Sequence, residues 1–143
     1  MNDRFLVAVD DSPAGLTAAR TAVDLAARLG AAVLFVHVVA DGAVTSMSGG
    51  AGGNAQVAER RDLAASSLLH HVAGIAQRAG VAAETRRLEG EPAGRVLDEA
   101  RAWRATVIVL GRSGRRGAGE PYMGRETRHV LEFAEQPVLV VPW

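Results

Sequence analysis

Short and almost continuous runs of apolar residues recur along the chain, and longer, more polar segments separate them. Such runs are typical of strands that are buried on both faces of a parallel sheet. The clearest runs are Phe5–Val9, Ala32–Val39 and Thr106–Leu110. A weaker run at Val81–Leu88 has partly alternating polarity and indicates a strand near an edge, and Pro137–Val141 predicts a final strand.

The segments between these runs repeat apolar residues at helical spacing, which predicts amphipathic helices packed on the sheet. Ser12 followed by Pro13 supplies a helix cap with proline at the first helical position, and Gly30 supplies a stop signal. Residues 40–55 are dominated by Gly, Ser and Ala and are predicted to form a loop. The helices are expected over about residues 13–29, 56–79, 92–103 and 125–134.

Strands and helices that alternate in this way predict an open, five-stranded parallel α/β sheet with helices on both faces, a Rossmann-like architecture. Ligands of such sheets bind outside the carboxyl ends of the strands, where the strand order reverses. We expect residues 1–143 to form a single domain, because the chain has one domain's length and contains neither an internal repeat nor a linker.

Composition excludes several classes of function. The chain has no Cys, which removes disulfide and thiol chemistry, and no Lys, which removes a P-loop or a Schiff base. The net charge of zero argues against a nucleic-acid partner. No apolar stretch approaches the roughly 20 residues of a membrane helix, and no secretory signal is recognisable, so we expect a cytoplasmic protein without a membrane partner.

Glycines and arginines gather after the fourth predicted strand. Gly111 and Gly114 follow that strand directly, and two such glycines allow a backbone to approach a ligand closely. Gly124 begins the segment Gly124–Thr127, where a helix start leaves free N–H groups for an anion. Residues 111–128 carry a net charge of +3 within a neutral chain. This pattern favours a phosphate-binding loop, although turns and surfaces also use glycine and arginine.

Other candidate sites have weaker support. Asp10 and Asp11 end the first strand, as in a phosphoacceptor receiver domain, but the Lys that such a domain needs is absent. His37 lies within a strand, where a packed and hydrogen-bonded role is expected. His70 and His71 are adjacent on a helix and diverge by about 100°, so they cannot chelate one ion together. We therefore expect no metal centre built from histidines.

The spacing Gly111-x2-Gly114-x9-Gly124, after a Val-Ile-Val-Leu strand, resembles that of the universal stress protein family. Residues 7–12 resemble the opening strand and turn of that family, and residues 36–39 resemble its second strand. The resemblance covers the whole chain with consistent spacing. It implies the strand order 3-2-1-4-5.

Nucleotide-binding members of this family hold ATP or AMP between the first and fourth strands. Carried over to this chain, the resemblance implies that Ala8 and Asp10 meet the adenosine part of the ligand. It implies that Val38 hydrogen-bonds adenine through its backbone, and that Leu110 and Gly111 line the ribose. The implied cofactor is ATP or AMP, alone or with Mg²⁺.

The resemblance also implies that Gly114, Gly124, Arg125 and Glu126 cradle the phosphates. Two features depart from the family pattern. Arg125 stands where the family has Ser or Thr, and residues 119–122 replace an apolar, helix-like run. A guanidinium can replace the hydroxyl as an anion ligand, or it can fill the site and exclude the nucleotide.

These observations predict an adenine-nucleotide-binding stress-response protein that acts as a sensor or regulator. No nucleophile is placed beside a base, so any ATP hydrolysis would be slow and incidental. The alternative is a nucleotide-free homodimeric module of the same family, with Arg125 filling the site.

The last predicted strand is apolar on both faces, and no charge interrupts it. Such an edge invites pairing with another strand. The sequence, together with the resemblance, predicts a homodimer in which residues 137–143 pair with their two-fold copy. The alternative is that a loop or helix of the same subunit covers this edge.

Overall fold

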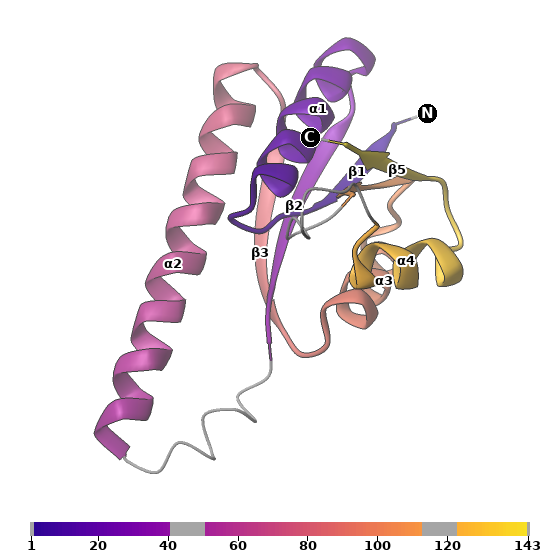
Figure 1. The fold of residues 1–143 in the computed structure, drawn as a ribbon. Helices are drawn as coiled ribbons and strands as arrows, with labels where there is room; N and C mark the ends of the chain where they lie inside the picture. The colour runs from indigo at the N-terminus through magenta and orange to yellow at the C-terminus, as the bar shows by residue number, and fades with distance from the viewer. Residues whose placement is uncertain (1, 41–50, 113–122, 143) are drawn as a thin grey trace.

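Five strands alternate with four helices along the described residues, 2–40, 51–112 and 123–142, of the computed structural model (Figure 1). In chain order the elements are β1 (Arg4–Ala8), α1 (Pro13–Leu29), β2 (Ala32–Val39), α2 (Ala51–Arg78), β3 (Ala83–Glu89), α3 (Pro92–Trp103), β4 (Val107–Gly111), α4 (Arg125–Phe133) and β5 (Val138–Val141).

The strands form one sheet in the order β3-β2-β1-β4-β5, and all neighbouring strands are parallel. β1 therefore lies in the middle, with β2 on one side and β4 on the other, and the strand order reverses at β1. The last pair of β1 with β2 joins Ala8 to Val36, and its last pair with β4 joins Val7 to Val109. The predicted fold class and strand order are confirmed, as is the edge position of β3.

The sheet separates two apolar layers. α1 and α2 cover one face (Figure 1), where Val7, Phe35 and Val72 are fully buried. α3 and α4 cover the other face, where Leu6 and Ile108 are fully buried. Because successive residues of a strand point to opposite faces, the neighbours Leu6 and Val7 pack in different layers. Both faces of the central strands are apolar, which explains their nearly continuous hydrophobic runs.

Helix α2 begins at Ala51, so the prediction of a loop over residues 51–55 is wrong. Residues 55–60 of this helix are exposed, and Figure 1 shows its first turns extending past the carboxyl ends of β2 and β3. A helix segment that covers no core needs no apolar stripe, so hydrophobic periodicity could not reveal it. The rest of the predicted loop, residues 41–50, lies outside the described residues.

The two edge strands differ in charge. β3 has the sequence AETRRLE, and Arg87 Nη2 lies 2.6 Å from Asp62 Oδ1 of α2. The preceding side chain, Arg86, forms an ion pair with Glu99 of α3 on the other side of the strand. β5 has the sequence VLVV and carries no charge. Charged side chains discourage an edge from pairing with another chain, so β3 is protected by its own residues and β5 is not.

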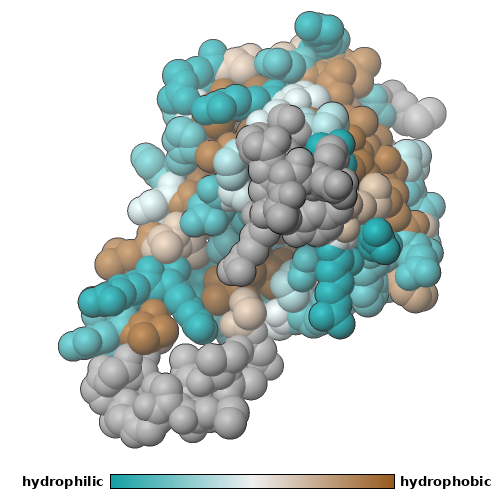
Figure 2. All heavy atoms as spheres, viewed as in Figure 1, coloured by the Kyte–Doolittle hydropathy of each residue, from teal (hydrophilic) through white to brown (hydrophobic). Residues whose placement is uncertain are grey.

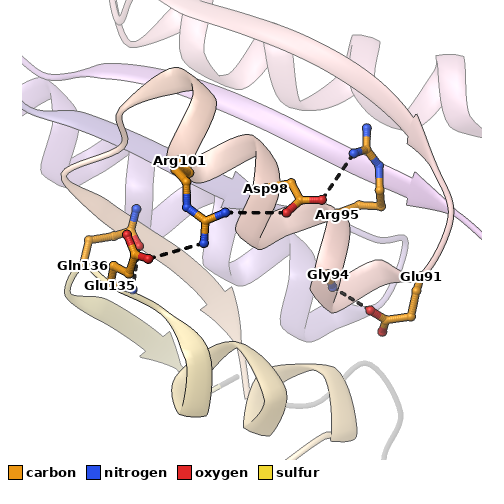
Figure 3. A network of polar contacts seen from close by, with 7 residues as sticks. All are labelled: Glu91, Gly94, Arg95, Asp98, Arg101, Glu135 and Gln136. Carbon is orange, nitrogen blue, oxygen red and sulfur yellow. Dashed lines mark hydrogen bonds and ion pairs between the residues drawn. The ribbon is translucent and has the colours of Figure 1, made fainter.

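Polar contacts join the surface of α3 to the turn after α4 (Figure 3). Arg101 Nη2 lies 3.4 Å from Glu135 Oε1, and Asp98 lies between Arg101 and Arg95, at 3.9 and 3.7 Å. These side chains are largely exposed, so each pair contributes at most about 1 kcal/mol. The position of α3 against α4 therefore depends mainly on apolar contacts, such as those of Val96.

Candidate functional site

A pocket of about 670 Å³ opens at the carboxyl ends of β1, β2 and β4, where the strand order reverses. The N-terminal ends of α1, α3 and α4 form its other walls. Open α/β sheets bind their ligands at this position. All predicted site residues that the structure describes line the pocket: Ala8, Asp10, Val38, Leu110, Gly111, Gly124, Arg125 and Glu126. Gly114 lies outside the described residues.

The turn after β1 forms one wall and is held by its own polar groups. Asp10 Oδ1 accepts hydrogen bonds from the N–H of Ser12, at 2.9 Å, and from the Ser12 hydroxyl. Ser12 Oγ in turn accepts from the N–H of Gly15 at 3.1 Å and caps α1. The Asp10 carboxylate is therefore fixed before any ligand enters.

The backbone of Val38 offers hydrogen-bonding groups to the pocket. The N–H of Val9 donates to the carbonyl of Val36 at 2.9 Å, so the peptide groups of Val36 point toward β1. The N–H of Gly90 donates to the carbonyl of Val39 at 3.1 Å, on the β3 side. Because peptide groups alternate along a strand, the N–H and C=O of Val38 point toward β1. The last pair of β1 with β2 is at Val36, so Val38 presents a donor and an acceptor beyond it.

Two of the three helix starts at the pocket are capped by a side chain. Ser12 caps α1, and Glu91 caps α3 (Figure 3). The carboxylate of Glu91 accepts from the N–H groups of Ala93, at 3.2 Å, and Gly94, at 2.6 Å. These caps occupy N–H groups that a helix start otherwise leaves free.

The start of α4 has no side-chain cap, because the capping position is Gly124. The first hydrogen bond within α4 runs from the N–H of Arg128 to the carbonyl of Gly124 at 3.0 Å. The N–H groups of residues 125–127 therefore have no backbone partner within the described part of the chain. They add to the positive end of the helix dipole, which favours an anion in the pocket. The side chains of Arg125 and Glu126 are exposed at this end.

Gly15 and Gly111 are required for packing. A Cβ on Gly111 would lie 2.8 Å from both the carbonyl carbon and the carbonyl oxygen of Ala14 in α1. A Cβ on Gly15 would lie 2.3 Å from Asp10 Oδ1. The structure shows that helix α1 approaches Gly111 closely, and Gly111 also lines the pocket, so the predicted ligand contact there stays a prediction.

Several pocket residues were not identified from the sequence. His37 lines the pocket, and its Nδ1 lies 2.9 Å from the carbonyl of Val9, so Nδ1 must carry the donated proton. The expected hydrogen-bonded role of His37 is confirmed, but its place at the pocket was missed. Thr127 and the first turn of α3 also line the pocket. The hydroxyl of Thr127, in the predicted first turn of a helix after Gly124, was an available signal.

Neither a metal cluster nor a membrane span is found in the described ranges. They contain no group of three or more His, Cys, Asp or Glu side chains that could hold a metal ion. None of the helices within these ranges is both long enough and apolar enough to cross a membrane.

The sheet order and the pocket at its switch point define a Rossmann-like α/β protein. The universal stress protein family model matches residues 1–142. The universal stress protein YxiE of Bacillus subtilis is 32% identical over 149 residues, which cover 99% of each chain. The solved structure of universal stress protein UspA from Lactobacillus plantarum is 25% identical, covers 97% of each chain and gives a TM-score of 0.80. This chain therefore belongs to the universal stress protein family.

Three solved structures with the same fold hold adenine nucleotides. The Archaeoglobus fulgidus universal stress protein in complex with dAMP is 23% identical, with a TM-score of 0.70 and coverage of 98% and 97%. The Arabidopsis thaliana family protein with AMP bound is 18% identical, with a TM-score of 0.70 and coverage of 98% and 91%. A universal stress protein in complex with cAMP is 21% identical, with a TM-score of 0.72 and coverage of 99% and 97%. At these identities the likeness shows the fold alone.

Replacing Gly111 by alanine should lower the free energy of unfolding by about 1–3 kcal/mol, because the added Cβ meets backbone atoms of Ala14. Gly74→Ala in α2 is a matched control. Its Cβ would lie 3.2 Å from Arg78 Nη1, the end of a flexible side chain. Alanine also favours a helix interior, so this variant should be more stable by up to about 1 kcal/mol. Urea unfolding measures both changes. A Gly111→Ala variant as stable as the wild type would contradict the close packing of α1.

Proposed function

We propose that this protein binds an adenine nucleotide, ATP or AMP, and acts as a sensor or regulator in a stress response. The observation that carries the proposal is the uncapped start of α4, which opens into the pocket at the switch point. The pocket volume of about 670 Å³ is within the range of roughly 300–1,000 Å³ that is usual for small-molecule sites. The adenine nucleotides in three structures of the same fold support the choice of ligand.

In this proposal the adenine lies against Val38, whose backbone donor and acceptor match the two polar groups on one edge of the base. Ala8 and Asp10 meet the adenosine part, and Leu110 and Gly111 line the ribose. The side chains around this end of the pocket are mostly apolar, which suits an aromatic base.

The phosphates bind in this proposal at the start of α4, against Gly124, Arg125 and Glu126, together with Gly114. The ligands there are backbone N–H groups, so the negative charge of Glu126 does not prevent binding. Mg²⁺ would accompany ATP mainly through the phosphates and water, because Mg²⁺ usually keeps several waters and few protein ligands.

Arg125 favours binding over a blocked site. Its side chain is exposed, while the pocket beside it retains its volume. No ion pair within the described ranges involves Arg125. An exposed guanidinium at the positive end of α4 can bind a terminal phosphate in place of the Ser or Thr hydroxyl that the family pattern has at this position.

A regulatory role is favoured over catalysis by the contacts of the pocket side chains. The Ser12 hydroxyl bonds to Asp10 and Gly15, and His37 bonds to the carbonyl of Val9. No hydrogen bond within the described residues joins a hydroxyl to a histidine, so none of these groups forms an activated nucleophile.

Isothermal titration calorimetry with ATP and AMP tests nucleotide binding directly. We expect measurable heats and a higher melting temperature with either ligand. IMP is a matched control, because it differs from AMP at the base edge that Val38 faces and should bind more weakly. If neither ATP nor AMP gives heat or a thermal shift at millimolar concentration, the alternative of a nucleotide-free module holds.

Arg125→Ala should weaken binding of ATP more than of AMP, because in this proposal the guanidinium binds a terminal phosphate that AMP lacks. A charge-assisted hydrogen bond contributes roughly 1.5–3 kcal/mol, and exposure of Arg125 favours the lower end of that range. Arg128→Ala is the control: it removes the same charge from α4 at an exposed position that does not line the pocket. Arg125→Ser restores the hydroxyl of the family pattern. Tighter binding by Arg125→Ala would show instead that Arg125 blocks the site.

We also propose that the protein is a homodimer in which β5, with residues 137–143, pairs antiparallel with its two-fold copy. β5 is an uncharged edge strand, whereas the opposite edge, β3, carries four charged residues. Figure 2 shows apolar surface gathered on the side of the molecule where β5 lies. An apolar edge with unpaired backbone groups is stabilised by a second strand.

Val140→Pro should shift the protein from dimer to monomer. The carbonyls of Pro137 and Val141 accept from the N–H groups of Ile108 and Arg112, at 3.0 Å each, so by alternation the N–H of Val140 points to the outer edge. Proline removes this outward donor and leaves the pairing with β4 in place. Val140→Ala keeps the N–H and should remain dimeric. Sedimentation at micromolar concentration distinguishes one from two monomer masses. A monomeric wild type, or a dimer unaffected by the proline, would contradict this interface.

A further inference from the structure

Thr127 is the one polar residue that is buried within the described ranges, with 6% of its surface exposed. Its hydroxyl donates to the carbonyl of Gly111 at 2.9 Å, which joins the first turn of α4 to the end of β4. A buried hydroxyl without a partner is costly, so this contact is a requirement of the local fold. Thr127 also lines the pocket.

The carbonyl of Gly111 lies on the pocket side of β4. The N–H of Arg112 donates to the carbonyl of Val141 at 3.0 Å, so Arg112 points toward β5. By alternation the peptide groups of Gly111 point toward β1, whose last pair with β4 is at Val109. A free carbonyl here would present partial negative charge to an anion. The hydroxyl of Thr127 occupies that carbonyl.

A second hydrogen bond completes the connection between β4 and α4. The N–H of Gly124 donates to the carbonyl of Arg112 at 2.7 Å. With the contact from Thr127 to Gly111, the carbonyls of the last residue of β4 and of the residue after it accept from the first turn and the capping residue of α4. The orientation of the N–H groups of residues 125–127, which have no backbone partner among the described residues, is therefore set by contacts within the protein.

We infer that Thr127 is a positioning residue for the phosphate end of the site. This inference rests on the proposed nucleotide function. Thr127 aims the N–H groups at the start of α4 and keeps the carbonyl of Gly111 from facing the anion, without its own hydroxyl binding the ligand. Its effect should therefore be limited to the phosphate part of the nucleotide.

Two matched pairs test this role. Thr127→Val replaces the hydroxyl of the wild type by a methyl group, and Thr127→Ala differs from Thr127→Ser by a hydroxyl alone. The second pair keeps the test available if the valine variant does not fold. Binding of AMP and of adenosine is measured for each protein by NMR titration, which also resolves weak binding, and melting temperatures are recorded alongside.

We expect the variants without a hydroxyl to bind AMP about fivefold more weakly, the equivalent of one ordinary hydrogen bond, with unchanged adenosine affinity. Thr127→Ser should retain the preference of the wild type for AMP over adenosine. A merely structural role would lower the melting temperature without changing the preference for AMP over adenosine, or it would weaken the binding of both ligands by the same factor. Either result would overturn the inference. A wild type that binds neither ligand would instead contradict the proposed nucleotide function.

Discussion

The first turn of α1 lies so close to the ends of β1 and β4 that neither Gly15 nor Gly111 has room for a Cβ. This close approach of α1 to β1 and β4 determines the positions of the segments that line the pocket. It places the turn that contains Asp10 and Ser12 beside the end of β4, and the hydrogen bonds of that turn fix its carboxylate. The pocket opens beyond this contact, where β1 has ended and its neighbours continue.

The chemistry of the pocket follows from which backbone groups remain unpaired. In a parallel sheet the backbone groups of neighbouring strands are paired along their length. Val38 lies past the last pair of β1 with β2, so its peptide groups have no paired residue of β1 beside them. α1 and α3 use side chains to cap their own starts, and α4, which begins after a glycine, does not. Among the described residues, the donors without a backbone partner thus collect at the start of α4. A neutral protein can in this way present a local site that suits an anion, without a cluster of buried charges.

The two edge strands of the sheet differ in the charges that they carry. The arginines of β3 form ion pairs with α2 on one face and α3 on the other, so they hold the edge strand to its own subunit. β5 lacks such groups, and its side chains pack in both apolar layers, with Val141 in one and Val138 against the other. This difference is the physical reason that association is proposed at β5 and not at β3.

The sequence by itself determined the architecture, because strands buried on both faces produce continuous apolar runs such as Thr106–Leu110 that no other element requires. It also indicated the surroundings of the site, since a glycine directly after a buried strand marks a place where the backbone is closely approached. It could not reveal where α2 begins, because residues 55–60 near its start are exposed and an exposed segment needs no apolar periodicity.

Only the tertiary structure decided how the pocket is built. Contacts between distant segments decide that Gly111 accommodates α1, that Val38 lies beyond the last pair of β1 with β2, and that His37 reaches the pocket. The role of Thr127 has the same origin, because its partner Gly111 is sixteen residues away in the chain and lies on another element. Local patterns report which residues are buried or capped. They do not report which backbone groups remain unpaired when strands of unequal length lie side by side.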